Sequence, residues 1–246
     1  MMACPPPSQL TPFEILGFSE CGWGIALMTG LGNSIAIALG AYALGFVIGV
    51  TGAFGKLYGG PVGKDLWAVY TTLVRAVPEL VLILILYYAV PGIVNEILLS
   101  MGYDRIELPQ FATGVIVLAF VQGAYQTEVL RGAILAVPFG QIEAARAMGM
   151  PPILVARRII FPLMTSNAIP GLGNLWLNAT KDTALLAVIG LTELTKATAQ
   201  ASAATKAFFT LYAAAMVLYL VVSLASIFLV GRIEKWSRKG QRSVTG

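Results

Sequence analysis

The sequence predicts an all-α integral membrane protein with about five transmembrane helices. Its 246 residues are 57% hydrophobic and only 11% charged, and the mean hydropathy is +0.80. Ordinary soluble domains carry about a quarter charged residues. The apolar residues gather in runs close to the roughly 20 residues that a helix needs to cross a bilayer. We therefore expect lipid to solvate most of the chain.

The apolar runs define the predicted spans in order along the chain. In the first, which carries no charge, Gly45 and Gly49 have the G-x-x-x-G spacing that lets a second helix approach closely, unless they only reflect how common glycine is in membrane helices. The second span could begin near Trp67, because LWAVYTTLV is also apolar. The fourth contains Lys181 and Asp182 within a longer apolar stretch. The predicted spans cover residues 24–54, 76–90, 111–127, 166–190 and 207–230.

Lysine and arginine favour cytoplasmic connections, so their distribution predicts the orientation of the spans. The connections expected on the cytoplasmic side are rich in lysine and arginine. The 181–206 segment fits this alternation least well. Five spans then put the N-terminus outside and the C-terminus inside. We expect an extracytoplasmic tail (1–23), a transmembrane domain (24–231) and a basic tail (232–246) held on anionic lipid. The basic residues number 0, 3, 1, 4, 3 and 5 in residues 1–23, 55–75, 91–110, 128–158, 181–206 and 231–246.

Composition excludes several classes of function. The chain has no histidine, which removes histidine triads, histidine metal ligands and the usual physiological proton shuttle. The pI of 9.1 reflects membrane topology and not nucleic-acid binding, because the basic residues lie between and after apolar runs. Cys4 and Cys21 have a spacing that fits no metal motif. We expect incidental thiols there, with a disulfide as the alternative if the N-terminus is extracytoplasmic.

A short polar stretch, GQIEAARAMGM at residues 140–150, interrupts the apolar pattern in the largest predicted cytoplasmic connection. Pro138 and Gly140 indicate a helix start, and Gly149 indicates its end. Helical spacing lets Ala144, Ala145 and Met148 share one smooth face. Such a face suits docking into a groove on another protein. The alternative is an ordinary interfacial helix.

The segment EAARAMGMPPILVARRIIFP resembles the EAA loop in permease subunits of ATP-binding-cassette (ABC) importers. The resemblance covers roughly residues 30–230 and includes YTTLVRAVPELVLILILYY, GAYQTEVLRGAILAVPFGQIEAA and IPGLGNLWLNATKDTALLAVIGLTEL. It is nearest to the histidine/lysine/arginine/ornithine and opine permeases. One departure is RAVP at residues 75–78, where R-G-T-P is usual. The loop pattern rests on Glu143, Ala144, Ala145, Gly149, Ile160 and Pro162, with Arg146 inside it.

The resemblance implies a type I ABC importer permease fold whose loop, about residues 138–162, couples to a cytoplasmic ATPase dimer. It also implies an extracytoplasmic solute-binding protein, a second permease that is a related chain or a copy of this one, and a multi-pass protein of the bacterial inner membrane. Related chains are usual in the histidine type, which favours a heterodimer. ATP and magnesium would bind to the partner ATPase. This chain is not expected to be an enzyme or to bind a cofactor, because VTGAFGKL has Val50 and Leu57 at two positions that a phosphate-binding loop needs.

Ionisable residues inside a membrane are costly and indicate function. Glu79 would favour a cationic solute such as arginine, lysine, histidine, ornithine or an opine, although an ion pair with Arg75 on the same helical face is equally possible. Lys181 could bind the carboxylate of an amino acid or form a structural bridge, and Asp182 should find a partner elsewhere. Glu128 and Arg131 should form a local pair. The candidate path residues are Glu79, Lys181, Asp182, Asn174, Asn178 and Gln122.

Other functions compete with this interpretation. The same machinery could move glutamine or another polar amino acid, although Glu79 argues against an anionic one. A channel or structural subunit would need no ATPase, so the coupling loop argues against it. A membrane enzyme would need a nucleophile–base pair or a metal cluster, which we cannot assemble without histidine and with two cysteines.

Overall fold

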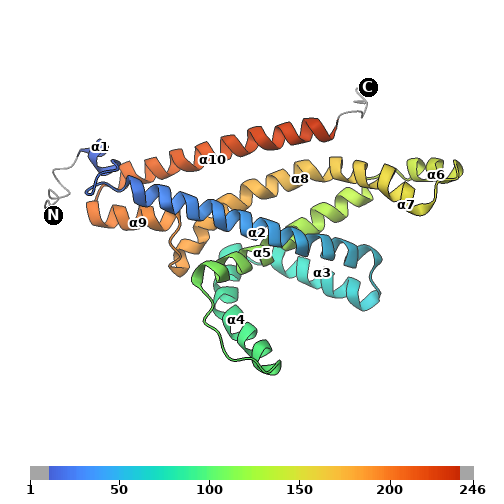
Figure 1. Ribbon diagram of the computed structural model, residues 1–246, viewed down its shortest axis with the longest axis horizontal. Helices are drawn as coiled ribbons and strands as arrows, with labels where there is room; N and C mark the ends of the chain where they lie inside the picture. The colour runs from blue at the N-terminus through green and yellow to red at the C-terminus, as the bar shows by residue number, and fades with distance from the viewer. Residues whose placement is uncertain (1–10, 239–246) are drawn as a thin grey trace.

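The computed structural model describes residues 11–238, and every regular element in this range is helical, which confirms the all-α class. Figure 1 shows an elongated bundle with α1 and α9 at one end and α6 and α7 at the other. We call these the α9 end and the α6 end. The elements are α1 (Pro12–Ile15), α2 (Gly24–Tyr58), α3 (Pro61–Ala76), α4 (Glu79–Ser100), α5 (Gln110–Leu135), α6 (Phe139–Ala147), α7 (Pro152–Val155), η2 (Ala156–Ile160), α8 (Phe161–Asp182), η3 (Thr183–Ile189), α9 (Leu194–Thr205) and α10 (Phe208–Ser237).

The centre of the bundle is the pair α2 and α5, the most extensive helix contact in the described chain. A Cβ atom built on Gly49 would lie 2.7 Å from Cβ of Gln126, and one on Gly45 would lie 3.2 Å from Cβ of Gln122. These glycines therefore let the two backbones approach closely, as the G-x-x-x-G spacing predicted. The buried core around this contact includes Ile37, Ala41, Val117, Leu118, Val121 and Ala124.

The predicted second span is divided into α3 and α4. Val77 has extended backbone, with φ −97° and ψ 142°, because the following proline disfavours helical backbone at this position. Ala76 ends α3 and does not begin the span, so the boundary predicted at residue 76 is wrong. The 16 residues of α3 extend about 24 Å, less than the roughly 30 Å of a hydrocarbon core. Figure 1 shows α4 projecting away from the body of the bundle.

A continuous helical stretch leads from Pro152 to Asp182. It consists of α7, the π-helical η2 and α8, and the flanking residues at both junctions keep right-handed helical backbone. The tighter η3 follows, and Gly190 ends it with a φ of 88°. The span predicted over 166–190 therefore ends where expected, but its helix begins earlier.

The α9 end contains a helix that the sequence pattern did not predict. The segment LTKATAQASAAT forms α9, whereas the sequence pattern predicts a connection over most of residues 181–206. Its alanine, threonine and serine side chains lack the long apolar run that indicated the other helices. The predicted fifth span is confirmed as helix, and α10 continues past residue 230 to Ser237. Cys21 is disulfide-bonded, so the expectation of an incidental thiol is wrong there, while Cys4 lies outside the described residues.

Three helices in residues 11–238 are long and apolar enough to cross a membrane, namely α2, α4 and α10. The predicted third and fourth spans correspond to α5 and α8, which are helices of 26 and 22 residues with more polar side chains. A buried glutamine pair on α5 and several asparagines on α8 lower their hydropathy. The number of spans and their orientation stay predictions.

Candidate functional site

The polar insert forms α6 and a tight turn at the α6 end of the bundle (Figure 1). Gly149 has a φ of +77°, which favours glycine. Its amide donates to the carbonyl of Arg146 at 2.9 Å, and the amide of Met150 donates to the carbonyl of Ala145 at 3.2 Å. These bonds satisfy carbonyls at the helix end that would otherwise lack partners. The predicted stop at Gly149 is confirmed, and α6 is a short capped helix.

The exposed face of α6 differs from the predicted one. Glu143, Ala144 and Arg146 are exposed, and Met148 is 83% exposed. Ala145 is only 6% exposed, because α6 packs against α7 and η2 on that side. The expectation that Ala145 shares the smooth outer face is therefore wrong. Of the other loop positions, Ile160 ends η2 and the exposed Pro162 lies in the first turn of α8.

A second group of polar residues gathers where α8 meets α5. The Nε2 atom of Gln122 donates to Oδ2 of Asp182 at 2.9 Å. Gln122 is 1% exposed, and its carbonyl oxygen has no hydrogen-bond partner among the described residues. Glu79 at the start of α4 lies within electrostatic range of Asp182 and faces the hydroxyl of Tyr125. Two predicted path acids and one predicted amide thus come together, and Tyr125 joins them although the sequence did not indicate it.

The remaining predicted path residues lie on α8 outside the hydrogen bonds of this cluster, although Lys181 directly precedes Asp182 and lies within electrostatic range of its carboxylate. Asn174, Asn178 and Lys181 are exposed on α8, and no side chain in residues 11–238 hydrogen-bonds to them. Arg75 ends α3 while Glu79 begins α4. The alternative of a same-helix ion pair between them is therefore wrong, since the helix breaks between the two residues.

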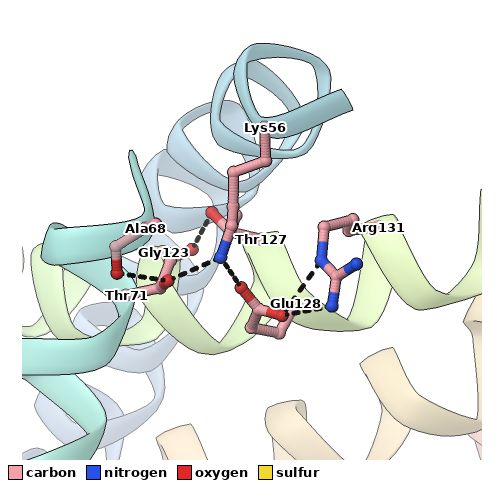
Figure 2. A network of polar contacts seen from close by, with 7 residues as sticks. All are labelled: Lys56, Ala68, Thr71, Gly123, Thr127, Glu128 and Arg131. Atoms are coloured by element: carbon pink, nitrogen blue, oxygen red, sulfur yellow. Dashed lines mark hydrogen bonds and ion pairs between the residues drawn. The ribbon is translucent and has the colours of Figure 1, made fainter. Parts of the chain in front are cut away.

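Figure 2 shows a charged network that joins α2, α3 and α5 near the α6 end. Glu128 accepts from Nε and NH2 of Arg131 at 3.1 and 3.0 Å, which confirms the predicted local pair. Lys56 contacts the same carboxylate and also donates to Oγ1 of Thr71 at 2.9 Å. Lys56 lies 72 residues from Glu128 along the chain, so spacing could not have predicted this contact.

A buried carboxylate that the sequence did not indicate lies at the α9 end. Glu193 is 0% exposed and caps α9 by accepting from the amide of Lys196 at 2.8 Å. Its other oxygen accepts from Ser34 of α2 at 3.2 Å and from Tyr219 of α10 at 3.1 Å. One side chain thus holds three helices together. The only local signal was an acid directly before a helix-forming run.

Long apolar helices with a polar cluster between them are features of an integral membrane protein. The model of the family "binding-protein-dependent transport system inner membrane component" matches residues 41–239. The chain therefore belongs to this family of transport-system membrane components.

Three known proteins illustrate the likeness. The chain is 39% identical to the nopaline transport system permease protein NocQ of Agrobacterium fabrum, over 93% of this chain and 98% of that protein. It is 38% identical to the histidine/lysine/arginine/ornithine transport system permease protein HisQ of Escherichia coli, over 83% and 90%. A crystal structure of an amino acid ABC transporter with histidines matches with a TM-score of 0.74 at 29% identity, covering 87% of this chain and 94% of that one.

Proposed function

We propose that this chain is the permease subunit of an ATP-driven importer for basic amino acids or related opines. Its family membership and its likeness to opine and basic amino acid permeases support the transport class. In this proposal the chain forms part of the path, a separate ATPase hydrolyses ATP with magnesium, and an extracytoplasmic binding protein delivers the solute. A second permease, most simply a related chain, completes the path in the bacterial inner membrane.

The observation that carries the choice of solute is that Glu79 lies within electrostatic range of Asp182. Acids inside a membrane are retained where they face a path or a partner. Two carboxylates within electrostatic range of each other favour a guest with a positive charge over a neutral or anionic one. Lys181 lies on α8 immediately before Asp182, is exposed, and is available for the carboxylate of the guest. Gln122 orients Asp182 through the 2.9 Å bond.

The α6 helix supports coupling to an ATPase. Its exposed small and apolar side chains, Ala144 and Met148, lie four residues apart and suit a groove on another protein. Glu143 and Arg146 flank them with charge. The turn at Gly149 holds α6 against the start of the stretch that leads to Asp182. We propose that the ATPase moves α6 and that α8 moves with it.

The proposed orientation follows the charges. The α6 end carries Arg146 and the exposed Arg157 and Arg158, and basic residues favour the cytoplasmic side. The α9 end then faces outward. A tag at the C-terminus should therefore resist protease added to intact spheroplasts.

The test combines assembly with uptake. The tagged chain is purified in mild detergent from its own host, and co-purifying proteins are identified by mass spectrometry. The comparison is the variant Glu143→Lys with Gly149→Asp. We expect an ATPase with the unaltered chain and none with the variant. Absence of an ATPase from both samples would contradict the importer proposal.

Uptake assays then test whether the transported solute is cationic. Arginine and citrulline have nearly the same shape, but only arginine carries a side-chain charge. We expect whole cells to take up radiolabelled arginine and to exclude citrulline. Uptake of glutamine with no uptake of arginine would favour the neutral polar amino acids instead.

A further inference from the structure

An apolar groove lies between α2, α5 and the helical stretch of η2 and α8, toward the α6 end of the bundle. Its volume is about 450 Å³. Ala53 and Leu130 line it from the small buried core between these helices, and Phe54 and Phe161 line it with exposed rings. The only polar side-chain atom among its lining residues is the hydroxyl of Tyr58. We call it the α2–η2 groove, and none of the candidate path residues lines it.

The length of the α2–η2 groove fits one leaflet of a bilayer. Its lining residues on α2 extend from Phe46 to Tyr58, which corresponds to a helical rise of about 18 Å. The hydrocarbon core of a bilayer is about 30 Å thick, so one leaflet contributes about half of that. Apolar cavities exclude water. A lipid acyl chain is therefore the occupant that matches both the lining and the length.

Positive charge lies at one end of the α2–η2 groove. Arg157 and Arg158 are exposed on η2, and Ala156 and Ile160 of the same short helix line the groove. Arg157 also lies four residues before Phe161, another lining residue, and residues four apart share one side of a helix. Neither arginine has a hydrogen-bonded or ion-paired side chain among residues 11–238. Both guanidinium groups are therefore available to a ligand.

The neighbouring cations at this end are in a different state. Lys56 and Arg131 both pair with Glu128, so their charges are already balanced within the protein. Tyr58 ends α2 and is 70% exposed, and its hydroxyl can donate a hydrogen bond. Tyrosine is enriched where a membrane meets water. The unpaired positive charge and this hydroxyl mark the polar end of an otherwise apolar groove.

We propose that the α2–η2 groove is a binding site for an anionic phospholipid, with one acyl chain in the groove and the phosphate on Arg157. A guanidinium group binds phosphate oxygens through two parallel hydrogen bonds. Basic pockets between membrane helices recognise anionic head groups, whereas a zwitterionic head group offsets its own phosphate charge. The bound chain fills the space between η2 and the α2–α5 pair. The inference depends neither on the transported solute nor on the ATPase, so it and the proposed function can fail separately.

Photolabelling with two lipids tests the site. The chain, with the subunits that co-purify with it, is placed in nanodiscs that contain phosphatidylglycerol or phosphatidylcholine with the same diazirine-bearing acyl chain at equal mole fraction. Labelled peptides are identified by mass spectrometry. We expect phosphatidylglycerol to label the groove peptides about fivefold more than phosphatidylcholine, which is the preference that one arginine near an anionic head group supplies. The exposed apolar surface of α10 around Leu220 and Leu224 should be labelled equally by both lipids.

Two other patterns of labelling would overturn the inference. Equal labelling of the groove by the two lipids would mean that it takes any acyl chain without regard to the head group. No labelling of the groove by either lipid would mean that another subunit covers it.

Matched variants separate the charge from the groove. Arg157→Gln should lower labelling by phosphatidylglycerol to the level of phosphatidylcholine, whereas Arg232→Gln, at an exposed arginine of α10, should leave it unchanged. Ala156→Phe adds a ring at an exposed position that lines the groove and should lower labelling by both lipids. Ala204→Phe, at an exposed position of α9, is its control. Unchanged labelling with Arg157→Gln, or an equal loss with Arg232→Gln, would overturn the inference.

Discussion

Gln122 and Asp182 lie 60 residues apart in the chain, yet the amide of one donates to the carboxylate of the other at 2.9 Å. Gln122 belongs to the tightly packed α2–α5 pair, and Asp182 ends α8. The bond therefore connects the most extensive helix contact of the described chain to the helix that leads to α6. It also leaves the carbonyl oxygen of Gln122 buried without a partner among the described residues.

Replacing Gln122 with leucine should destabilise the protein by about 1–3 kcal/mol, because the half-buried carboxylate of Asp182 loses its donor. Unfolding in detergent, followed by thermal scanning, measures the change. A double-mutant cycle with Asp182→Asn isolates the contact. A coupling energy near zero would mean that the two side chains do not interact.

Glu79→Gln should lower arginine uptake at least tenfold and leave the amount of protein in the membrane unchanged. The amide keeps the size of the side chain but removes the negative charge that faces Tyr125 and Asp182. Initial rates of radiolabelled uptake provide the measurement, and Glu79→Asp should retain most activity. Equal arginine uptake by the Gln variant and the unaltered chain would refute a role for this charge.

Gly49→Ala should destabilise the α2–α5 pair by about 1–3 kcal/mol through overpacking. The new methyl group would lie 2.7 Å from Cβ and 3.1 Å from the backbone carbon of Gln126, and neither can move freely. Gly32→Ala on the same helix is the control, because nothing lies within 4 Å of its added Cβ. The control should gain about 0.5–1 kcal/mol from better helix propensity. Similar melting temperatures for both variants would contradict this account of the helix contact.

Gly149→Ala should weaken ATPase binding through backbone strain of about 1–2 kcal/mol in the left-handed region. Steric crowding would not contribute, since no atom lies within 4 Å of the added Cβ. Gly140→Ala in α6 has equal space and no positive φ, so it should bind normally. A pull-down with the purified ATPase compares the two, and equal retention would show that the turn is not important for docking.

Glu128→Gln should destabilise the charged network more than Lys56→Met does. Removing the carboxylate leaves Lys56 and Arg131 facing each other without a counter-charge, whereas removing Lys56 keeps the pair of Glu128 with Arg131 at 3.0 Å. Each charged hydrogen bond contributes about 1.5–3 kcal/mol. Thermal scanning at low and high salt should rank the variants in this order. The reverse ranking would mean that Lys56 is the more important partner.

The helical class, most helix positions and the α6 turn could be predicted from the sequence. An apolar run specifies a helix, and Gly149 specifies a turn, through residues that are close together in the chain. Both features can therefore be recognised from short stretches of sequence. The helix break at Val77 was not predicted, because apolar residues continue on both sides of it. Pro78 is the one local residue that indicates the break. The α9 helix was missed because alanine and threonine give no clear apolar period.

Contacts across long sequence separations could not be predicted in the same way. Spacing within one helix predicted the pair of Glu128 with Arg131 but not the approach of Lys56. It also suggested that Arg75 would pair with Glu79 on one helix, but the two residues lie on different helices and form no ion pair among the described residues. Tyr125 and Glu193 became notable only once the packing of distant helices placed acids or hydroxyls beside them.

The unbroken run of helix from Pro152 to Asp182 has a mechanical consequence. A loop between α6 and the acidic cluster would absorb a push, but a rod of 31 residues, about 46 Å long, transmits it with little loss. Two places along this rod have weakened backbone hydrogen bonding: the π-helical turn at η2, and Pro170 inside α8, which has no amide hydrogen to donate. In the proposed coupling, a displacement of α6 would therefore reach Asp182 along this helix, with bending expected at η2 and at Pro170.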